Sequence, residues 1–137
     1  MNRSRLLTLV GLKTTIAQQA VRREAQKLAV ELARLNTLLK QIGDLELSYK
    51  DHLSLPALRP SEYRDTVSIL ARLQDRRTID SSRLTLLTVE RDRLAAMLAE
   101  KQRHIDRLGD EAKQARRDER AERDKLQEVL IPERRKQ

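Results

Sequence analysis

The sequence of 137 residues contains no cysteine, which excludes disulfide bonds and thiolate metal sites. Aromatic side chains are almost as scarce, with two tyrosines and no phenylalanine or tryptophan. Because aromatic residues normally supply much of the area buried in a compact core, their scarcity argues against a globular domain. Glycine and proline number three each, so the chain has few places at which it can turn.

Long apolar runs are missing as well. The segment Leu6–Leu12 near the start is interrupted by Thr8 and Gly11, and it is far shorter than the roughly 20 apolar residues of a membrane-spanning helix. Arg3 and Arg5 precede this segment as basic residues precede the apolar part of a signal peptide, but no small-residue cleavage site follows. We therefore expect a cytoplasmic protein without a signal peptide.

Charged residues are abundant instead. They make up 36% of the chain, which is otherwise rich in leucine, alanine and glutamine, and this composition is typical of long helices and coiled coils. The net charge is +8, and the first 43 residues contribute +6 of it, from eight basic and two acidic side chains. Such a basic segment favours an acidic protein surface, an anionic membrane or a nucleic acid as partner.

A seven-residue repeat runs through the first part of the chain. One row is apolar or aromatic at every position but one: Leu7, Thr14, Val21, Leu28, Leu35, Ile42 and Tyr49. The companion row is less regular: Gly11, Gln18, Ala25, Leu32, Leu39, Glu46 and Leu53. A strict seven-residue repeat keeps one seam of a helix against a partner helix, as in a coiled coil. We predict one helix from about residue 4 to about residue 53.

The only break in this pattern contains Pro56 and Pro60, which a helix interior does not tolerate. Ser61 is the expected N-cap of a second helix from about residue 61 to about residue 131, where Pro132 should end it. Its seam is predicted at two interleaved rows: Tyr63, Leu70, Arg77, Leu84, Arg91, Leu98, Ile105 and Ala112, with Leu73, Leu87, Leu94 and Leu108. The predicted fold is all-α: one two-helix antiparallel coiled-coil hairpin over residues 1–137, with a turn at about 54–60 and a longer second helix.

Folding the chain back at about residue 57 places residue 7 opposite about residue 107. Large apolar residues disappear from the second seam at about residue 112, so we expect the pairing to end there. Beyond it lies a charged overhang, residues 111–125, in which opposite charges three or four residues apart can stabilise a single helix. An apolar cluster follows, which suggests a docking end: Leu126, Val129, Leu130 and Ile131.

No motif for catalysis stands out. His52 and His104 are the only histidines, and neither has neighbours at metal-ligand spacing. A two-helix hairpin also offers no enclosed pocket for a reaction. We expect no enzyme activity, no cofactor, no metal and no small-molecule substrate. The absence of stacking aromatics, of a zinc finger and of a basic region followed by a zipper argues against a nucleic acid as the main partner.

The chain resembles the FliJ family, the small coiled-coil proteins of the flagellar export apparatus, and their YscO-like counterparts in virulence type III secretion. The resemblance covers the size, the cysteine-free composition, the basic first helix and the off-centre turn. Its best local match is residues 39–53, LKQIGDLELSYKDHL, followed by Tyr63 and Leu70 after the turn and by the charged segment 89–128. The aromatic residue that the family has just after the turn is absent, because Thr66 stands there.

The resemblance implies a stalk like the shaft of a rotary ATPase, which binds the hexameric FliI-like export ATPase and the FlhA-like export gate and assists export chaperones. Such a protein is cytoplasmic and peripheral to the inner face of the membrane through the export apparatus. Contact with the gate is expected at Leu38, Ile42, Leu45, Tyr49, Leu70 and Leu73. Contact with the ATPase is expected at Arg3, Arg5, Leu6, Arg116, Arg117, Arg120 and Arg123.

Two other functions fit the same residues. The seven-residue repeats are also typical of a general coiled-coil scaffold or homodimeric tether. The basic first helix would also suit a binder of nucleic acids or membrane surfaces.

Overall fold

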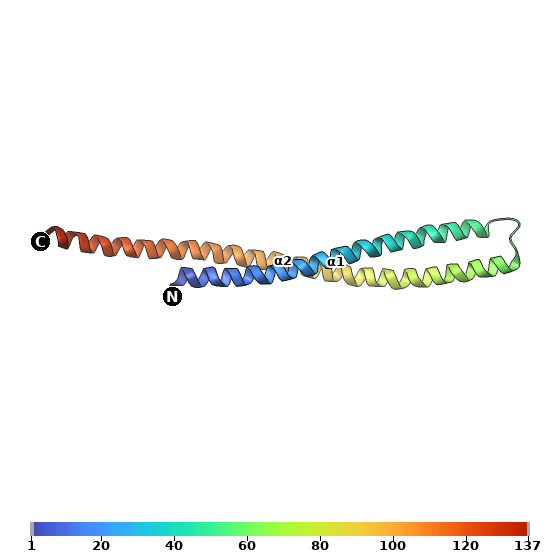
Figure 1. Cartoon of the computed structure of the whole chain (residues 1–137), viewed down its shortest axis with the longest axis horizontal. Helices are drawn as coiled ribbons and strands as arrows, with labels where there is room; N and C mark the ends of the chain where they lie inside the picture. Colours follow the sequence, from blue (N-terminus) through green and yellow to red (C-terminus); the bar gives the residue numbers. More distant parts are fainter. Residues whose placement is uncertain (1, 137) are drawn as a thin grey trace. The chain divides into compact units, whose positions relative to one another are not determined.

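The computed structural model describes the backbone of residues 2–136 and the side chains of residues 2–130. Over this range the chain forms two helices, α1 (Arg3–Leu53) and α2 (Pro60–Lys136), joined by residues 54–59 (Figure 1). The helices have 51 and 77 residues and pack against each other in antiparallel directions. The predicted all-α helical hairpin with a longer second helix is confirmed.

Each helix begins at a local signal. The Oδ1 atom of Asn2 accepts a hydrogen bond from the Arg5 N–H at 3.1 Å, so Asn2 is the N-cap of α1. At α2 the carbonyl of Arg59 accepts the first helical bond, from the Tyr63 N–H at 2.9 Å, and Pro60 is the first helical residue. Ser61 is therefore not the N-cap that we predicted. Proline suits the first position because its missing N–H would have had no helical partner there.

The end of α2 differs from the prediction too. The helix continues through Pro132 to Lys136, where we expected an end near residue 131. A proline removes one backbone hydrogen bond and bends a helix without always ending it.

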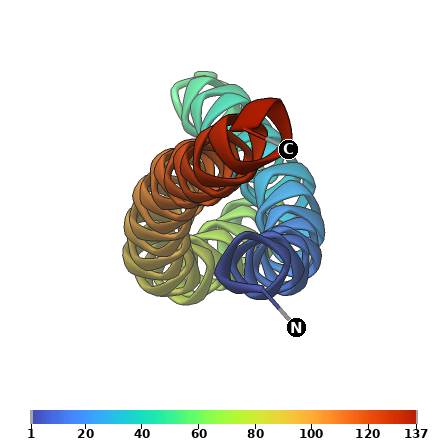
Figure 2. The same ribbon diagram turned by 90° about the vertical axis from the view of Figure 1, so that its left-hand side faces the viewer.

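Contacts within the chain gather into two compact units. Unit 1 comprises Met1–Arg22 and Ala96–Gln137, and unit 2 comprises Arg23–Ala95. In each unit a segment of α1 lies antiparallel to a segment of α2. Figure 2 faces unit 1, with the dark-blue start of α1 and the red end of α2 both toward the viewer. One continuous domain over residues 1–137 stays a prediction.

The core of unit 2 follows the predicted seam of α1. Leu28, Leu35 and Ile42 from the first row and Leu32 from the second are 4–8% exposed, and Leu94 of α2 is 3% exposed. Burying side chains of this size contributes about 1.5–3 kcal/mol each. The seven-residue repeat thus identified the apolar core of this unit correctly.

The core of unit 1 extends farther along α2 than predicted. Ala112 and Ala115 are 3% and 5% exposed, and Glu119 lies half-buried beside Ser4 of α1. The expectation that pairing ends near residue 112 was therefore wrong. Alanines are small, so they let two helix backbones approach closely, and the loss of large apolar residues does not mark the loss of a partner.

The buried row of α2 is also more polar than expected. In unit 2 the predicted seam position Tyr63 is 52% exposed, whereas Thr66 and Asp80 are 5% and 2% exposed. Thr66 and Asp80 share the heptad row of Leu73, Leu87 and Leu94. The leucines of this row were predicted to lie in the seam, but Thr66 and Asp80 were not assigned to it because they are polar.

Candidate interaction surfaces

Polar groups in the seam of unit 2 are matched with cations. The Oδ2 atom of Asp80 lies 3.2 Å from the Arg76 Nε, one turn earlier on α2. Across the helices, the Arg77 Nε lies 3.2 Å from the Glu46 Oε1. That Oε1 is buried without a hydrogen bond, so the Arg77 contact is electrostatic only. Charged pairs at a helix seam cost solvation and select one register over others.

Unit 1 contains uncharged and charged polar bridges between its helices. Gln18 donates from its Nε2 to the Gln102 Oε1 at 2.8 Å, and Gln18 is 5% exposed. Near the start of α1, the Ser4 hydroxyl donates to the Glu119 Oε2 at 2.9 Å, and the Ser4 N–H donates to Oε1 at 3.3 Å. The Glu119 carboxylate thus lies at the positive end of α1, where the helix dipole favours a negative charge. These bridges position α1 against α2 in this unit.

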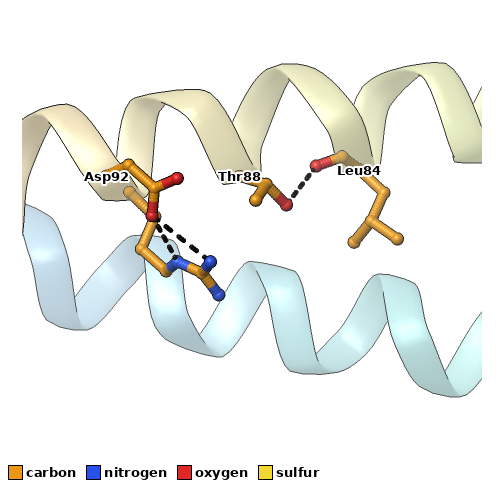
Figure 3. A network of polar contacts seen from close by, with 4 residues as sticks. Leu84, Thr88 and Asp92 are labelled. Atoms are coloured by element: carbon orange, nitrogen blue, oxygen red, sulfur yellow. Dashed lines mark hydrogen bonds and ion pairs between the residues drawn. The ribbon is translucent and has the colours of Figure 1, made fainter.

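Other charges on α2 are satisfied by near neighbours on the same helix. Figure 3 shows Asp92, whose Oδ1 atom accepts hydrogen bonds from Arg91. It also shows the Thr88 hydroxyl donating to the Leu84 carbonyl at 2.7 Å. A hydrogen bond from Arg93 lowers the pKa of Glu90, and the same bond raises the pKa of Arg93. Such local pairs are exposed and stabilise the helix only slightly, and they do not form a ligand site.

The histidines and acidic residues are the candidates for metal-ligand clusters among the described positions. No group of three or more His, Asp or Glu residues among the described positions could hold a metal ion. His52 lines an open groove in unit 2, and His104 lines one in unit 1 beside Lys101 and Arg107. The part of the chain that was described contains no helix long and apolar enough to cross a membrane.

The residues expected to contact an export gate all fall in unit 2 but differ in exposure. Ile42 is 7% exposed and belongs to the core, whereas Leu45 is 47% exposed. Leu38, Tyr49, Leu70 and Leu73 are half-buried. Leu45 and Tyr49 line one groove together with Thr66 and Leu55, near the connection between the helices. Leu70 lines a different groove, so the set does not form a single surface.

The residues expected to contact an ATPase all fall in unit 1 and are all exposed: Arg3, Arg5, Leu6, Arg116, Arg117, Arg120 and Arg123. Arg5 and Arg116 come from different helices yet line one groove of about 350 Å³, together with Ser4, Thr8 and Leu9. The Arg116 Nε donates to the Ala112 carbonyl at 3.3 Å. In this groove a predicted ATPase-contact residue of α1, Arg5, thus lies beside one of α2, Arg116.

α1 also carries an exposed apolar surface that was not predicted from the sequence. Five residues of unit 1 are 45–68% exposed: Leu6, Leu9, Val10, Leu12 and Ile16. We call them the α1 outer face. The spacing of Leu6, Leu9 and Ile16 could have revealed it, because residues 6, 13 and 20 and residues 9 and 16 form two further heptad rows, each two positions after a buried row.

The predicted apolar cluster near the end of α2 is exposed where its side chains are described. Leu126, Val129 and Leu130 are 65%, 63% and 54% exposed, and Ile131 lies outside the described side chains. Leu126 continues the row of Ala112 and Glu119, and Val129 continues that of Leu108 and Ala115. The helix face that α1 covers earlier in unit 1 therefore becomes apolar again where α1 no longer lies beside it.

The whole chain was compared with protein-family models, with curated proteins and with solved structures, and none of them matches it.

Proposed function

We propose that the chain is a non-enzymatic coiled-coil stalk of the FliJ kind, which binds a hexameric export ATPase through unit 1. The observation that carries this proposal is the groove shared by Arg5 and Arg116, beside an α2 arm that continues beyond the start of α1. Arginines on an exposed rim bind carboxylates well because their planar guanidinium groups donate in a fixed geometry. An acidic, ring-shaped partner would suit this end.

The groove of unit 2 that is lined by Leu45 and Tyr49 supports a second contact, with the export gate. It combines the exposed apolar side chains of Leu45 and Leu55 with the half-buried Tyr49, and tyrosine is enriched at protein interfaces. In this proposal the same protein assists export chaperones and works in the cytoplasm, peripheral to the inner face of the membrane through the export apparatus. Its activity needs no cofactor and no small-molecule substrate.

The test is an ATPase assay with a rotary-type export ATPase from the same genome. Excess wild-type chain should form a complex on gel filtration and raise the rate of hydrolysis. The R5Q/R116Q variant should weaken the complex about tenfold, because each lost arginine at an interface removes a charge-assisted contact. A matched control is R64Q/R72Q, which removes two exposed arginines from unit 2.

The control should bind the ATPase like the wild type. Absence of any complex with the ATPase, or equal weakening by both double variants, would contradict the proposal.

A homodimeric tether is the second candidate, and one observation favours it. Leu126 and Val129 continue the α1-facing rows of α2 into a region where α1 provides no cover. A second copy could cover these residues by pairing its own α2 arm in the opposite direction. In that case L126Q/V129Q would convert a dimer to a monomer in light scattering, whereas the stalk proposal expects a monomer for both proteins.

A further inference from the structure

The α1 outer face lies on the side of α1 opposite to its partner helix. Positions 4, 7, 11, 14, 18 and 21 are all buried or half-buried against α2. Positions 6, 9, 13, 16 and 20 each follow one of these by two residues, and all five are exposed. Two residues along an α-helix correspond to a rotation of about 200°. Leu6, Leu9 and Ile16 of the outer face therefore point away from the core of unit 1, and the exposed Val10 and Leu12 flank them.

This face is apolar where an exposed helix surface is normally polar. Leu12 and Ile16 are 57% and 68% exposed, and Leu6, Leu9 and Val10 are about half-exposed. Farther along α1 the same two heptad rows consist mainly of polar residues, such as Arg23, Lys27 and Arg34, with Val30 as an exposed exception. A run of large aliphatic side chains confined to three turns marks a surface that binds something.

The charges that α1 itself contributes around the outer face are all of one sign. Residues 1–22 contain four basic side chains and no aspartate or glutamate. Arg3, Arg5 and Lys13 are exposed and lie among the apolar residues. The combination of an aliphatic face with basic flanks is complementary to a surface that is apolar inside and anionic at its rim. A second copy of the same face would meet these charges with like charges.

The position of the apolar residues distinguishes a lipid surface from a partner helix. A third helix that contacts both helices of a pair lies over the groove between them, with its side-chain ridges in the grooves of each helix. The grooves beside α1 in unit 1 are lined mainly by hydroxyl and charged side chains, and only Leu9 of the outer face reaches one of them. Leu6, Val10, Leu12 and Ile16 are exposed and line neither groove. A bilayer needs no groove, because it adapts to a convex surface.

We propose that the α1 outer face is a membrane-surface site that inserts its aliphatic side chains among the lipids of an anionic bilayer. Leu9 and Ile16 enter the boundary between headgroups and acyl chains. Arg5 and Lys13 contact lipid phosphates from the flanks. This site goes beyond the proposed stalk function and does not depend on an ATPase.

Vesicle flotation with the full chain tests the site. Two vesicle preparations are compared, phosphatidylcholine alone and a mixture in which about one third of the lipid is phosphatidylglycerol. The wild type should float with the anionic vesicles, and the bound fraction should fall as salt rises. It should bind the neutral vesicles at least about tenfold more weakly.

Two matched double variants separate the outer face from general hydrophobicity. L9Q/I16Q should lower the partition coefficient on anionic vesicles at least about tenfold. I79Q/L86Q removes two apolar residues of unit 2 that are 58% and 71% exposed, and it should bind like the wild type. Circular dichroism checks that both variants keep the helix content of the wild type, as expected for exposed positions.

Several results would overturn this assignment. These are a wild type that stays off anionic vesicles at low salt, an L9Q/I16Q variant that binds like the wild type, or equal binding to neutral and anionic vesicles. A wild type that ignores vesicles but self-associates through Leu9 and Ile16 would identify a second copy of the chain as the occupant instead.

Discussion

Asp80 shows how a single polar residue can occupy the core of a coiled coil. Its exposure of 2% is below that of Leu94, and its carboxylate has the Arg76 guanidinium at 3.2 Å. Arg76 itself is 61% exposed, so the pair connects the seam to solvent. Removing a carboxylate from water is costly, and one partly exposed cation offsets the cost incompletely. Asp80 should therefore lower the stability of unit 2 while it restricts the register of the helices.

Replacing Asp80 by leucine tests this balance. The D80L variant should unfold with a free energy about 1–2 kcal/mol higher than the wild type, because exchanging a buried ion pair for an apolar side chain of similar size is neutral or stabilising. The new leucine would join Leu73, Leu87 and Leu94 in one heptad row. Urea unfolding followed by circular dichroism measures the change.

The control for this prediction is R76Q, which leaves the carboxylate in place without its cation. It should cost about 1 kcal/mol, because a buried charge loses its partner. A large loss of stability in D80L would contradict the argument and would mean that Asp80 makes a favourable contact in the seam.

At the scale of the helices, glycines reveal where packing constrains α1 and α2. A methyl group at Gly109 would meet nothing within 4 Å, whereas one at Gly43 would lie 3.3 Å from the Arg77 Nη2. Arg77 is flexible, but it pairs with Glu46 across the helices of unit 2. Both glycines lie in helix interiors, but only at Gly43 would a larger side chain contact a neighbouring residue.

The G109A variant should raise the free energy of unfolding by about 0.5–1 kcal/mol, because alanine loses less backbone entropy than glycine in a helix. G43A should gain less, since Arg77 must move away from its present position. Thermal unfolding of the two variants measures the difference. A larger gain for G43A than for G109A would show that Arg77 is not constrained at this site.

At the scale of the whole molecule, the seams explain how the chain buries its apolar rows without a globular core. Each unit covers the apolar rows of α1 with α2 of the same chain. The excess of positive charge, +8, adds repulsion between copies. Exposed large apolar residues remain in both units: in unit 1 they are the α1 outer face and the residues around Leu126, and in unit 2 they are more scattered, as at Val30, Ile79 and Leu86.

We expect a monomer of 15.9 kDa in light scattering at moderate salt. The physical reason is that intramolecular pairing already satisfies most seam positions, so that a second copy has little left to bury. A mass of twice this value that persists on dilution would contradict the prediction and would favour the homodimeric tether.

The two helices, the break between them and the apolar core of unit 2 were predictable, because they follow from local rules. Proline placement and a seven-residue repeat act over short stretches of chain, so Leu28, Leu35 and Ile42 could be assigned to the core from their spacing alone. The predicted ATPase-contact arginines are exposed, and Arg5 and Arg116 share a groove. Their contact with an ATPase stays a prediction, as does the gate contact.

Other features depended on how the two helices meet. Periodicity identifies the face of a helix that needs a partner, but many registers satisfy it equally well. Only the packed structure shows that Glu119 reaches Ser4, that Asp80 lies in the seam, and that alanines extend the pairing past residue 112. The same packing decides that Leu9 and Ile16 remain outside, because a helix with two apolar faces can bury only one of them against a single partner.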